Sequence, residues 1–65
     1  MTVYVNDGEY TLDEGCTVNQ LLGKLKYGTY AAVWINGDQV LRREYATKVL
    51  KEGDKVTVIR PLGGG

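Results

Sequence analysis

The 65-residue chain has no histidine and no phenylalanine, and it has a single cysteine and a single proline. Because histidine is the most common acid–base catalyst near neutral pH, its absence argues against an enzyme that works on its own. A lone cysteine cannot form an internal disulfide, which favours a reducing compartment, and we expect the cytoplasm. A domain of this size buries only roughly 60% of its unfolded surface, so a deep, enclosed active site is not expected.

Net charge and long apolar runs are missing as well. Eight Lys/Arg residues balance eight Asp/Glu residues, so no long-range attraction to nucleic acid or to anionic membranes is expected. No apolar run approaches the roughly 18–20 residues of a membrane-spanning helix. The first residues alternate as in a strand, without the charged start and apolar core of a signal peptide. We expect neither nucleic acid nor a membrane as a partner.

Four of the eight acidic residues occur in two short groups, at 13–14 and at 52 and 54. Both groups lie beside a glycine, and turn formation accounts for them better than acid–base catalysis or metal binding. With no histidine and no second cysteine to complete a site, no metal ion is expected.

The N-terminal residues are typical of a β-hairpin. Residues 2–5 and 9–12 carry β-branched and aromatic side chains, and the Asp7-Gly8 pair between them is a turn signal. Val3 and Val5 are two residues apart and are therefore expected on one face of the sheet.

The strongest helix signal covers residues 18–26. A capping box marks its start, with Thr17 as the N-cap and Gln20 as its reciprocal partner. Apolar side chains then recur at helical spacing, at Val18, Leu21, Leu22 and Leu25. Gly28 is expected to end the helix in a left-handed conformation.

Cys16 lies directly before this capping box. Such a residue can pack on Leu21 as a hydrophobic staple. We therefore predict a buried structural residue at Cys16, and not a thiol that handles sulfur.

The second half of the chain predicts a second hairpin and a final strand. Residues 30–35 are almost continuously apolar, Asn36-Gly37-Asp38 is a turn signal, and residues 39–41 return. Residues 55–60 alternate as a last strand, which Pro61 ends because proline lacks a backbone donor.

The segment between these elements has no long period. Tyr45, Ala46 and Val49 are predicted to form one short helical or 3₁₀ turn under the sheet. In the last strand, Val56 and Val58 are expected to share one face.

The order of elements is strand, strand, helix, strand, short strand, irregular connection and strand. This order predicts an α+β fold, a ubiquitin-like β-grasp with a mixed sheet of about five strands on one helix, because a crossover helix favours a parallel pairing across it. We predict one domain over residues 1–62, followed by a flexible glycine tail at residues 63–65.

The chain ends in Gly63-Gly64-Gly65. An ordinary disordered terminus or a cloning remnant would also be rich in glycine. A carboxylate that must enter another enzyme's narrow channel, however, needs neighbours without side chains and a backbone free to adopt unusual dihedrals. Free carboxylates are poor acyl donors, so we expect ATP to activate the terminus as an acyl-adenylate, which a sulfur nucleophile then converts to a thiocarboxylate.

Several motifs together resemble one known family. They are Asn6-Asp7, Thr17-Val18-Asn19-Gln20-Leu21-Leu22, Trp34-Ile35-Asn36-Gly37-Asp38-Gln39-Val40, Arg43-Glu44, Glu52-Gly53-Asp54-Lys55-Val56 and the terminal glycines. With these motifs the whole chain resembles the ThiS family, the sulfur carriers of thiamine biosynthesis. More broadly it resembles the group that includes the small subunit of molybdopterin synthase.

The resemblance implies a carrier that is a substrate and not itself an enzyme. It implies that a zinc-containing, E1-like (ThiF-like) adenylating enzyme activates Gly65 with ATP and magnesium, while the carrier binds no cofactor. Gly64 then provides access beside the reacting residue, and Gly63 is an additional glycine beyond the minimal pair. The resemblance also implies a cysteine desulfurase pathway as the sulfur source and a ThiG-like thiazole synthase as the acceptor.

A small apolar surface near the tail is the expected contact with the adenylating enzyme, with Leu41, Arg60 and Leu62 as its candidates.

Three alternative functions stay open from the residues alone. The chain could deliver sulfur to molybdopterin or another thiolation pathway, it could be a protein modifier joined to lysines, or it could be a β-grasp interaction module with an inert tail.

Overall fold

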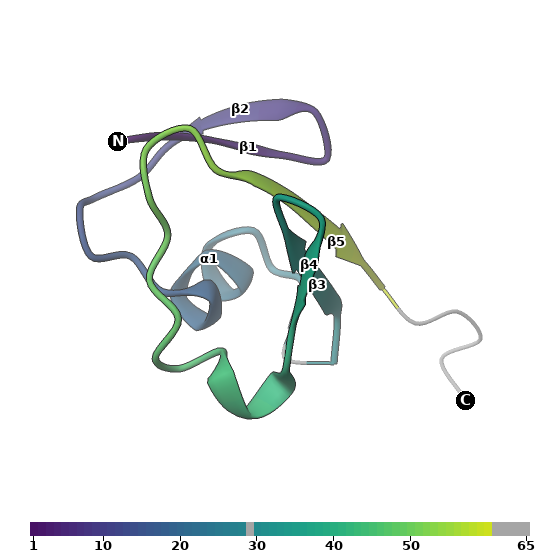
Figure 1. Cartoon of the computed structure of the whole chain (residues 1–65). Coiled ribbons are helices and arrows are strands. Elements are labelled where there is room, and N and C mark those ends of the chain that lie inside the picture. The colour runs from purple at the N-terminus through teal and green to yellow at the C-terminus, as the bar shows by residue number, and fades with distance from the viewer. Residues whose placement is uncertain (29, 61–65) are drawn as a thin grey trace.

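Five strands form one mixed sheet in the structure, a computed structural model that describes residues 1–28 and 30–60 (Figure 1). The strands are β1 (Thr2–Val5), β2 (Gly8–Thr11), β3 (Ala32–Ile35), β4 (Asp38–Val40) and β5 (Lys55–Ile59). Their order is β2-β1-β5-β3-β4. β1 and β5 are parallel, and the other neighbouring pairs are antiparallel. The predicted β-grasp fold is confirmed.

The first hairpin turns one residue earlier than predicted. Its two-residue loop is Asn6-Asp7, with φ angles of 49° and 69°, and Gly8 already belongs to β2, opposite Val5. Asparagine and aspartate tolerate the positive φ that a tight hairpin turn requires, so the loop does not need the glycine. The second loop is Asn36-Gly37, and Asp38, which was predicted to belong to the turn, is already the first residue of β4, opposite Ile35.

Helix α1 (Val18–Lys24) begins with the predicted capping box. Thr17 Oγ1 accepts a hydrogen bond from the Gln20 amide at 3.2 Å, and Gln20 Oε1 accepts one from the Thr17 amide at 3.0 Å. Three members of the apolar stripe are buried and the fourth is half-buried, namely Val18, Leu21, Leu22 and Leu25. The helix therefore lies with this face against the sheet (Figure 1).

The helix ends two residues before its predicted end. Lys26, with a φ of 61°, is the left-handed residue that ends the helix, and Gly28, where the stop was expected, is also left-handed, with a φ of 80°. The Tyr27 amide donates to the Leu22 carbonyl at 2.9 Å and the Lys26 amide donates to the Gly23 carbonyl at 3.2 Å, which are the paired bonds of a Schellman motif. Tyr27 packs against the core, and this apolar contact fixes the stop where no glycine is present.

The connection from β4 to β5 contains a 3₁₀ turn, η1 (Arg42–Glu44). The turn was predicted later, within residues 45–49, and that position is wrong. It forms earlier because Glu44 Oε1 accepts a hydrogen bond from the Leu41 amide at 3.0 Å, which satisfies a donor at the start of the turn.

Only one of the three residues predicted to lie under the sheet is buried. Tyr45 is 4% exposed, and its hydroxyl donates to the Ala31 carbonyl at 2.7 Å. Ala46 and Val49 are exposed. The connection is therefore anchored by one aromatic side chain, and the next buried residue is Leu50.

The core lies between α1 and the inner face of the sheet. The valines predicted to share a face do so, and all four are buried: Val3, Val5, Val56 and Val58. β5 lies in the middle of the sheet and runs parallel to β1, so its C-terminal end lies at the opposite end of the molecule from the start of β1 (Figure 1).

Candidate functional site

The strand that leads to the glycine tail is paired on both sides. β5 contacts β1 in parallel and β3 in antiparallel orientation, and its last pair is Ile59 with Ala32. The predicted tail, Gly63-Gly64-Gly65, and the predicted contact residue Leu62 lie outside the described residues. The described part of the site is therefore the root of the tail, which ends at Arg60.

Asn6 extends the contact between β1 and β5 past the end of β1. Its Oδ1 accepts a hydrogen bond from the Val58 amide at 2.9 Å, and its Nδ2 donates to the Val58 carbonyl at 3.0 Å. The backbone amide of Asn6 donates to the Val56 carbonyl at 2.9 Å. The left-handed backbone of Asn6 turns the chain away from β5. Its side-chain amide therefore makes the hydrogen bonds to Val58 that the backbone of one further β1 residue would have made.

Asn36 makes the matching contact with the start of β5 from the side of β3. Its Oδ1 accepts a hydrogen bond from the Lys55 amide at 3.0 Å, and its own backbone amide donates to the Lys55 carbonyl at 2.7 Å. Asn6 and Asn36 have nearly the same φ, 49° and 52°. Each hairpin loop therefore supplies one asparagine that holds β5, one near its start and one near its end.

Arg60 folds back onto the segment that follows α1. Its guanidinium lies over the Tyr27 ring, 4.7 Å from the ring centre, and its Nη2 donates to the Lys26 carbonyl at 3.2 Å. The Tyr27 hydroxyl in turn accepts a hydrogen bond from Asn6 Nδ2 at 3.2 Å. The first hairpin loop, the helix end and the end of β5 therefore meet at the root of the tail.

Leu41 directly follows the last residue of β4. It is 44% exposed, whereas the preceding Val40 is buried, and Ile59 is 53% exposed. Ile59 pairs with Ala32, and Val40 pairs with Val33, the next residue of β3. Leu41 and Ile59 therefore flank the first residue of β3, at the end of the sheet where the tail begins.

The three predicted contact residues do not form one described cluster. Arg60 packs toward the helix end, Leu41 is exposed between β4 and η1, and Leu62 is outside the described residues. Ile59 is an exposed apolar residue at this end of the sheet that was not among the predicted contact residues. Its exposure could have been predicted, because a strand with Val56 and Val58 inward places Ile59 outward.

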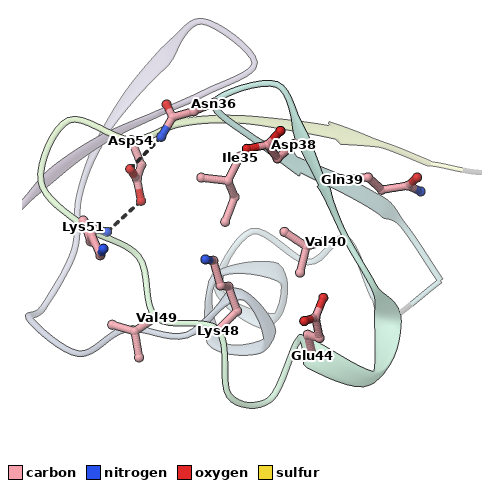
Figure 2. A pocket seen from close by; sticks show the side chains of 10 residues that line it. All are labelled: Ile35, Asn36, Asp38, Gln39, Val40, Glu44, Lys48, Val49, Lys51 and Asp54. Atoms are coloured by element: carbon pink, nitrogen blue, oxygen red, sulfur yellow. Dashed lines mark hydrogen bonds between the residues drawn. The ribbon is translucent and has the colours of Figure 1, made fainter.

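A cavity of about 360 Å³ lies between the second hairpin and the connection that follows it (Figure 2). Its most buried charged side chain is Asp54, which accepts hydrogen bonds from Asn36 Nδ2 at 3.0 Å and from the Lys51 amide at 2.8 Å. Figure 2 shows Glu44 and Lys48 entering the cavity from the connection. In residues 1–28 and 30–60, every buried side-chain nitrogen and oxygen has a hydrogen-bond partner, and the two bonds of Asp54 join the second hairpin loop to the connection directly before β5.

Cys16 is buried, as predicted, with 9% of its surface exposed. Burial raises the pKa of its thiol by desolvating the thiolate, with Lys24 acting in the opposite direction and Asp13 in the same direction. A thiol with a raised pKa is a poor nucleophile at neutral pH.

The described part of the chain contains no group of three or more His, Cys, Asp or Glu side chains that could hold a metal ion. None of its helices is long and apolar enough to cross a membrane.

The fold and the tail root match a known family. Residues 3–65 match the family model described as the ThiS family. The chain belongs to the ThiS family. Because the match reaches residue 65, it includes the glycine tail, and the resemblance drawn from the motifs is confirmed.

Two solved structures from Geobacter metallireducens are similar to this ThiS-family chain. The crystal structure of a thiamine biosynthesis protein (ThiS) is 33% identical, with full coverage of both chains and a TM-score of 0.82. The NMR solution structure of a thiamine biosynthesis protein is also 33% identical, covering 100% of this chain and 88% of that chain, with a TM-score of 0.79. No curated protein matches the chain.

Proposed function

We propose that this chain is a sulfur carrier of thiamine biosynthesis and that the terminal carboxylate of Gly65 carries the sulfur. The observation that supports this most directly is the family match, which runs through residue 65. The similarity to a ThiS structure over the full length of both chains supports the same role. The carrier acts in the cytoplasm as a protein substrate, and it is not itself an enzyme.

The chemistry proceeds in three steps at Gly65. A carboxylate oxygen attacks the α-phosphorus of ATP, pyrophosphate leaves, and the acyl-adenylate forms. A persulfide that a desulfurase forms from cysteine then attacks the carbonyl carbon with its terminal sulfur, and AMP leaves. A thiol finally attacks the inner sulfur of this acyl disulfide, forms a new disulfide with it, and releases the thiocarboxylate on Gly65. ATP and magnesium belong to the ThiF-like adenylating enzyme, and a ThiG-like thiazole synthase receives the sulfur.

Gly63 and Gly64 allow Gly65 to enter the active-site channel of the adenylating enzyme. Gly64 has no side chain to collide with the walls of a narrow channel, and its backbone can adopt dihedrals that other residues avoid. Gly63 extends this freedom by one residue. The division between a domain at 1–62 and a tail at 63–65 remains a prediction, because residues 61–65 lie outside the described part.

The exposed end of the sheet provides the recognition surface. Leu41 and Ile59 form its apolar centre, and Leu62 lies three residues after Ile59 in the chain. Arg60 lies at the edge of this recognition surface, where its side chain contacts the helix end. A small apolar centre with a polar rim is typical of a transient protein interface.

The test is intact-mass spectrometry of the full chain after incubation with the cognate adenylating enzyme, ATP and a sulfur source. The expected result is replacement of one oxygen by sulfur at Gly65, localised by fragmentation. A Cys16→Ser variant should gain the same mass, because the sulfur is held on the tail. No mass change in the wild-type chain, or an unchanged sulfur yield after deletion of Gly64 and Gly65, would overturn the proposal.

A further inference from the structure

Arg60 lies one residue past the last pair of the sheet. The register between β3 and β5 ends with Ala32 and Ile59, so Arg60 is not placed by the ladder that holds the rest of β5. The following residue is Pro61, which confines the backbone of Arg60 to extended conformations but fixes no direction relative to the helix.

The side chain of Arg60 supplies the missing constraint. It contacts the Tyr27 ring at 4.7 Å and the Lys26 carbonyl at 3.2 Å. Tyr27 is itself immobilised, because it packs against the core and its hydroxyl bonds to Asn6 at 3.2 Å. The position of Arg60 therefore depends on a ring that belongs to the helix end, 33 residues earlier in the chain.

We propose that Tyr27 is a positioning residue for the tail reaction, because its ring holds Arg60 and so sets the direction in which the chain continues toward Gly65. This inference rests on the proposed function, since it assumes that the terminus enters the active site of an adenylating enzyme. Holding the root reduces the conformational entropy that the chain must lose on entry. Tyr27 acts through Arg60 and does not touch the reacting atoms.

The inference differs from a direct contact between Arg60 and the partner. If Arg60 bound the partner directly, a change at Tyr27 would have little effect on the reaction. If the ring positions Arg60, the loss of either side chain removes the same interaction, and the two losses do not add.

The test is a double-mutant cycle on pyrophosphate release by the cognate adenylating enzyme, with the full chain as substrate. Tyr27→Ala and Arg60→Ala are each expected to lower kcat/KM by about two- to fivefold, as the loss of an exposed cation–π contact implies. The double variant should be no worse than either single variant. Tyr27→Phe keeps the ring and should stay within about twofold of the wild type.

A matched control separates positioning from general loss of stability. Leu25 is also half-buried against the core, but it has no aromatic ring on which the Arg60 guanidinium could stack. Leu25→Ala should therefore lower the free energy of unfolding without changing kcat/KM under conditions in which all variants are folded. An equal loss of kcat/KM in Leu25→Ala, or additive losses in the Tyr27 and Arg60 cycle, would overturn the inference.

Nitrogen-15 relaxation of the free carrier keeps this inference separate from the proposed function. The Arg60 amide should become more mobile in Tyr27→Ala and in Arg60→Ala, but not in Tyr27→Phe. If the wild-type chain is never adenylated, the proposed function fails, and the relaxation data still decide whether Tyr27 holds Arg60. If adenylation is normal and Tyr27→Ala changes neither Arg60 mobility nor kcat/KM, only the positioning role is rejected.

Discussion

The side-chain amide of Asn6 pairs with the backbone of Val58 through two hydrogen bonds, accepting from the Val58 amide at 2.9 Å and donating to its carbonyl at 3.0 Å. The two residues are 52 positions apart. This pair joins the loop of the first hairpin to the strand that carries the tail. The side-chain amide of a turn residue therefore makes the two hydrogen bonds that the backbone of a neighbouring strand residue would otherwise make.

Asn6→Ala should lower the free energy of unfolding by about 2–3 kcal/mol. The substitution removes both bonds to Val58, leaves that partly buried backbone unpaired, and places alanine at a φ of 49°. Urea denaturation measures the change. Asn19→Ala, at an exposed position in α1, is the control and should change the free energy by no more than about 0.5 kcal/mol. Equal effects at both positions would contradict the role of Asn6.

Gly23→Ala should raise the free energy of unfolding by about 0.5–1 kcal/mol, because Gly23 is in the helix and a Cβ there meets no atom within 4 Å. Gly37→Ala is the matched control, since its Cβ also meets nothing within 4 Å but its φ is 88°. It should lower the free energy of unfolding by about 1–2 kcal/mol. Thermal melts of both variants check the opposite signs, and a loss of stability in Gly23→Ala would show that this glycine has another role.

Lys26→Gly should also be stabilising, by about 0.5–1 kcal/mol, because Lys26 occupies the left-handed position of the Schellman motif at a φ of 61°. Lys24→Gly, inside the helix, is the charge-matched control and should be destabilising by about the same amount. The comparison is made by chemical denaturation. If both glycines destabilise equally, the backbone at Lys26 is not strained.

The helix shows which parts of this fold can be predicted from sequence. Its start was predicted correctly, because the capping box of Thr17 and Gln20 is a local pattern. Its end was not, because a lysine adopts the left-handed conformation only when the next residue, Tyr27, packs on a core built by distant strands. The 3₁₀ turn was placed too late for a different reason, because the bond that fixes it, from the Leu41 amide to the Glu44 side chain, is local but was not recognised.

The candidate site divides in the same way. The chemistry of Gly65 was inferred from the composition and place of the tail, because a glycine run after a strand is visible in the sequence. The roles of Asn6 and Tyr27 at the tail root were not predicted, because their partners Val58 and Arg60 are distant in sequence. The available signal was an apolar residue followed by asparagine at both hairpin loops, which was interpreted only as turn chemistry.

Burial of Cys16 predicts a loss of stability at alkaline pH. Its folded-state pKa is raised above the ordinary value of 9.0, so above about pH 9 the unfolded chain loses the thiol proton while the folded chain keeps it. The contribution of this proton to the free energy of unfolding is fully present below that pH. It is lost as the pH rises through the folded-state pKa, with a slope of at most about 1.4 kcal/mol per pH unit. The difference between wild type and Cys16→Ala, measured by urea denaturation across this range, isolates the effect from other titrating groups. A difference that does not vary with pH would contradict it.

Leu41 and Val49 allow a matched test of the recognition surface, because both side chains are 44% exposed. Leu41 lies with Ile59 at the end of the sheet where the tail begins, whereas Val49 lies in the connection and forms a bridge with Thr17. Leu41→Ala should raise the KM for the carrier in the adenylation assay by about five- to tenfold and leave kcat unchanged, because the tail itself is unaltered. Val49→Ala should change neither constant. Equal increases in KM would mean that the adenylating enzyme does not distinguish this end of the sheet from the rest of the surface.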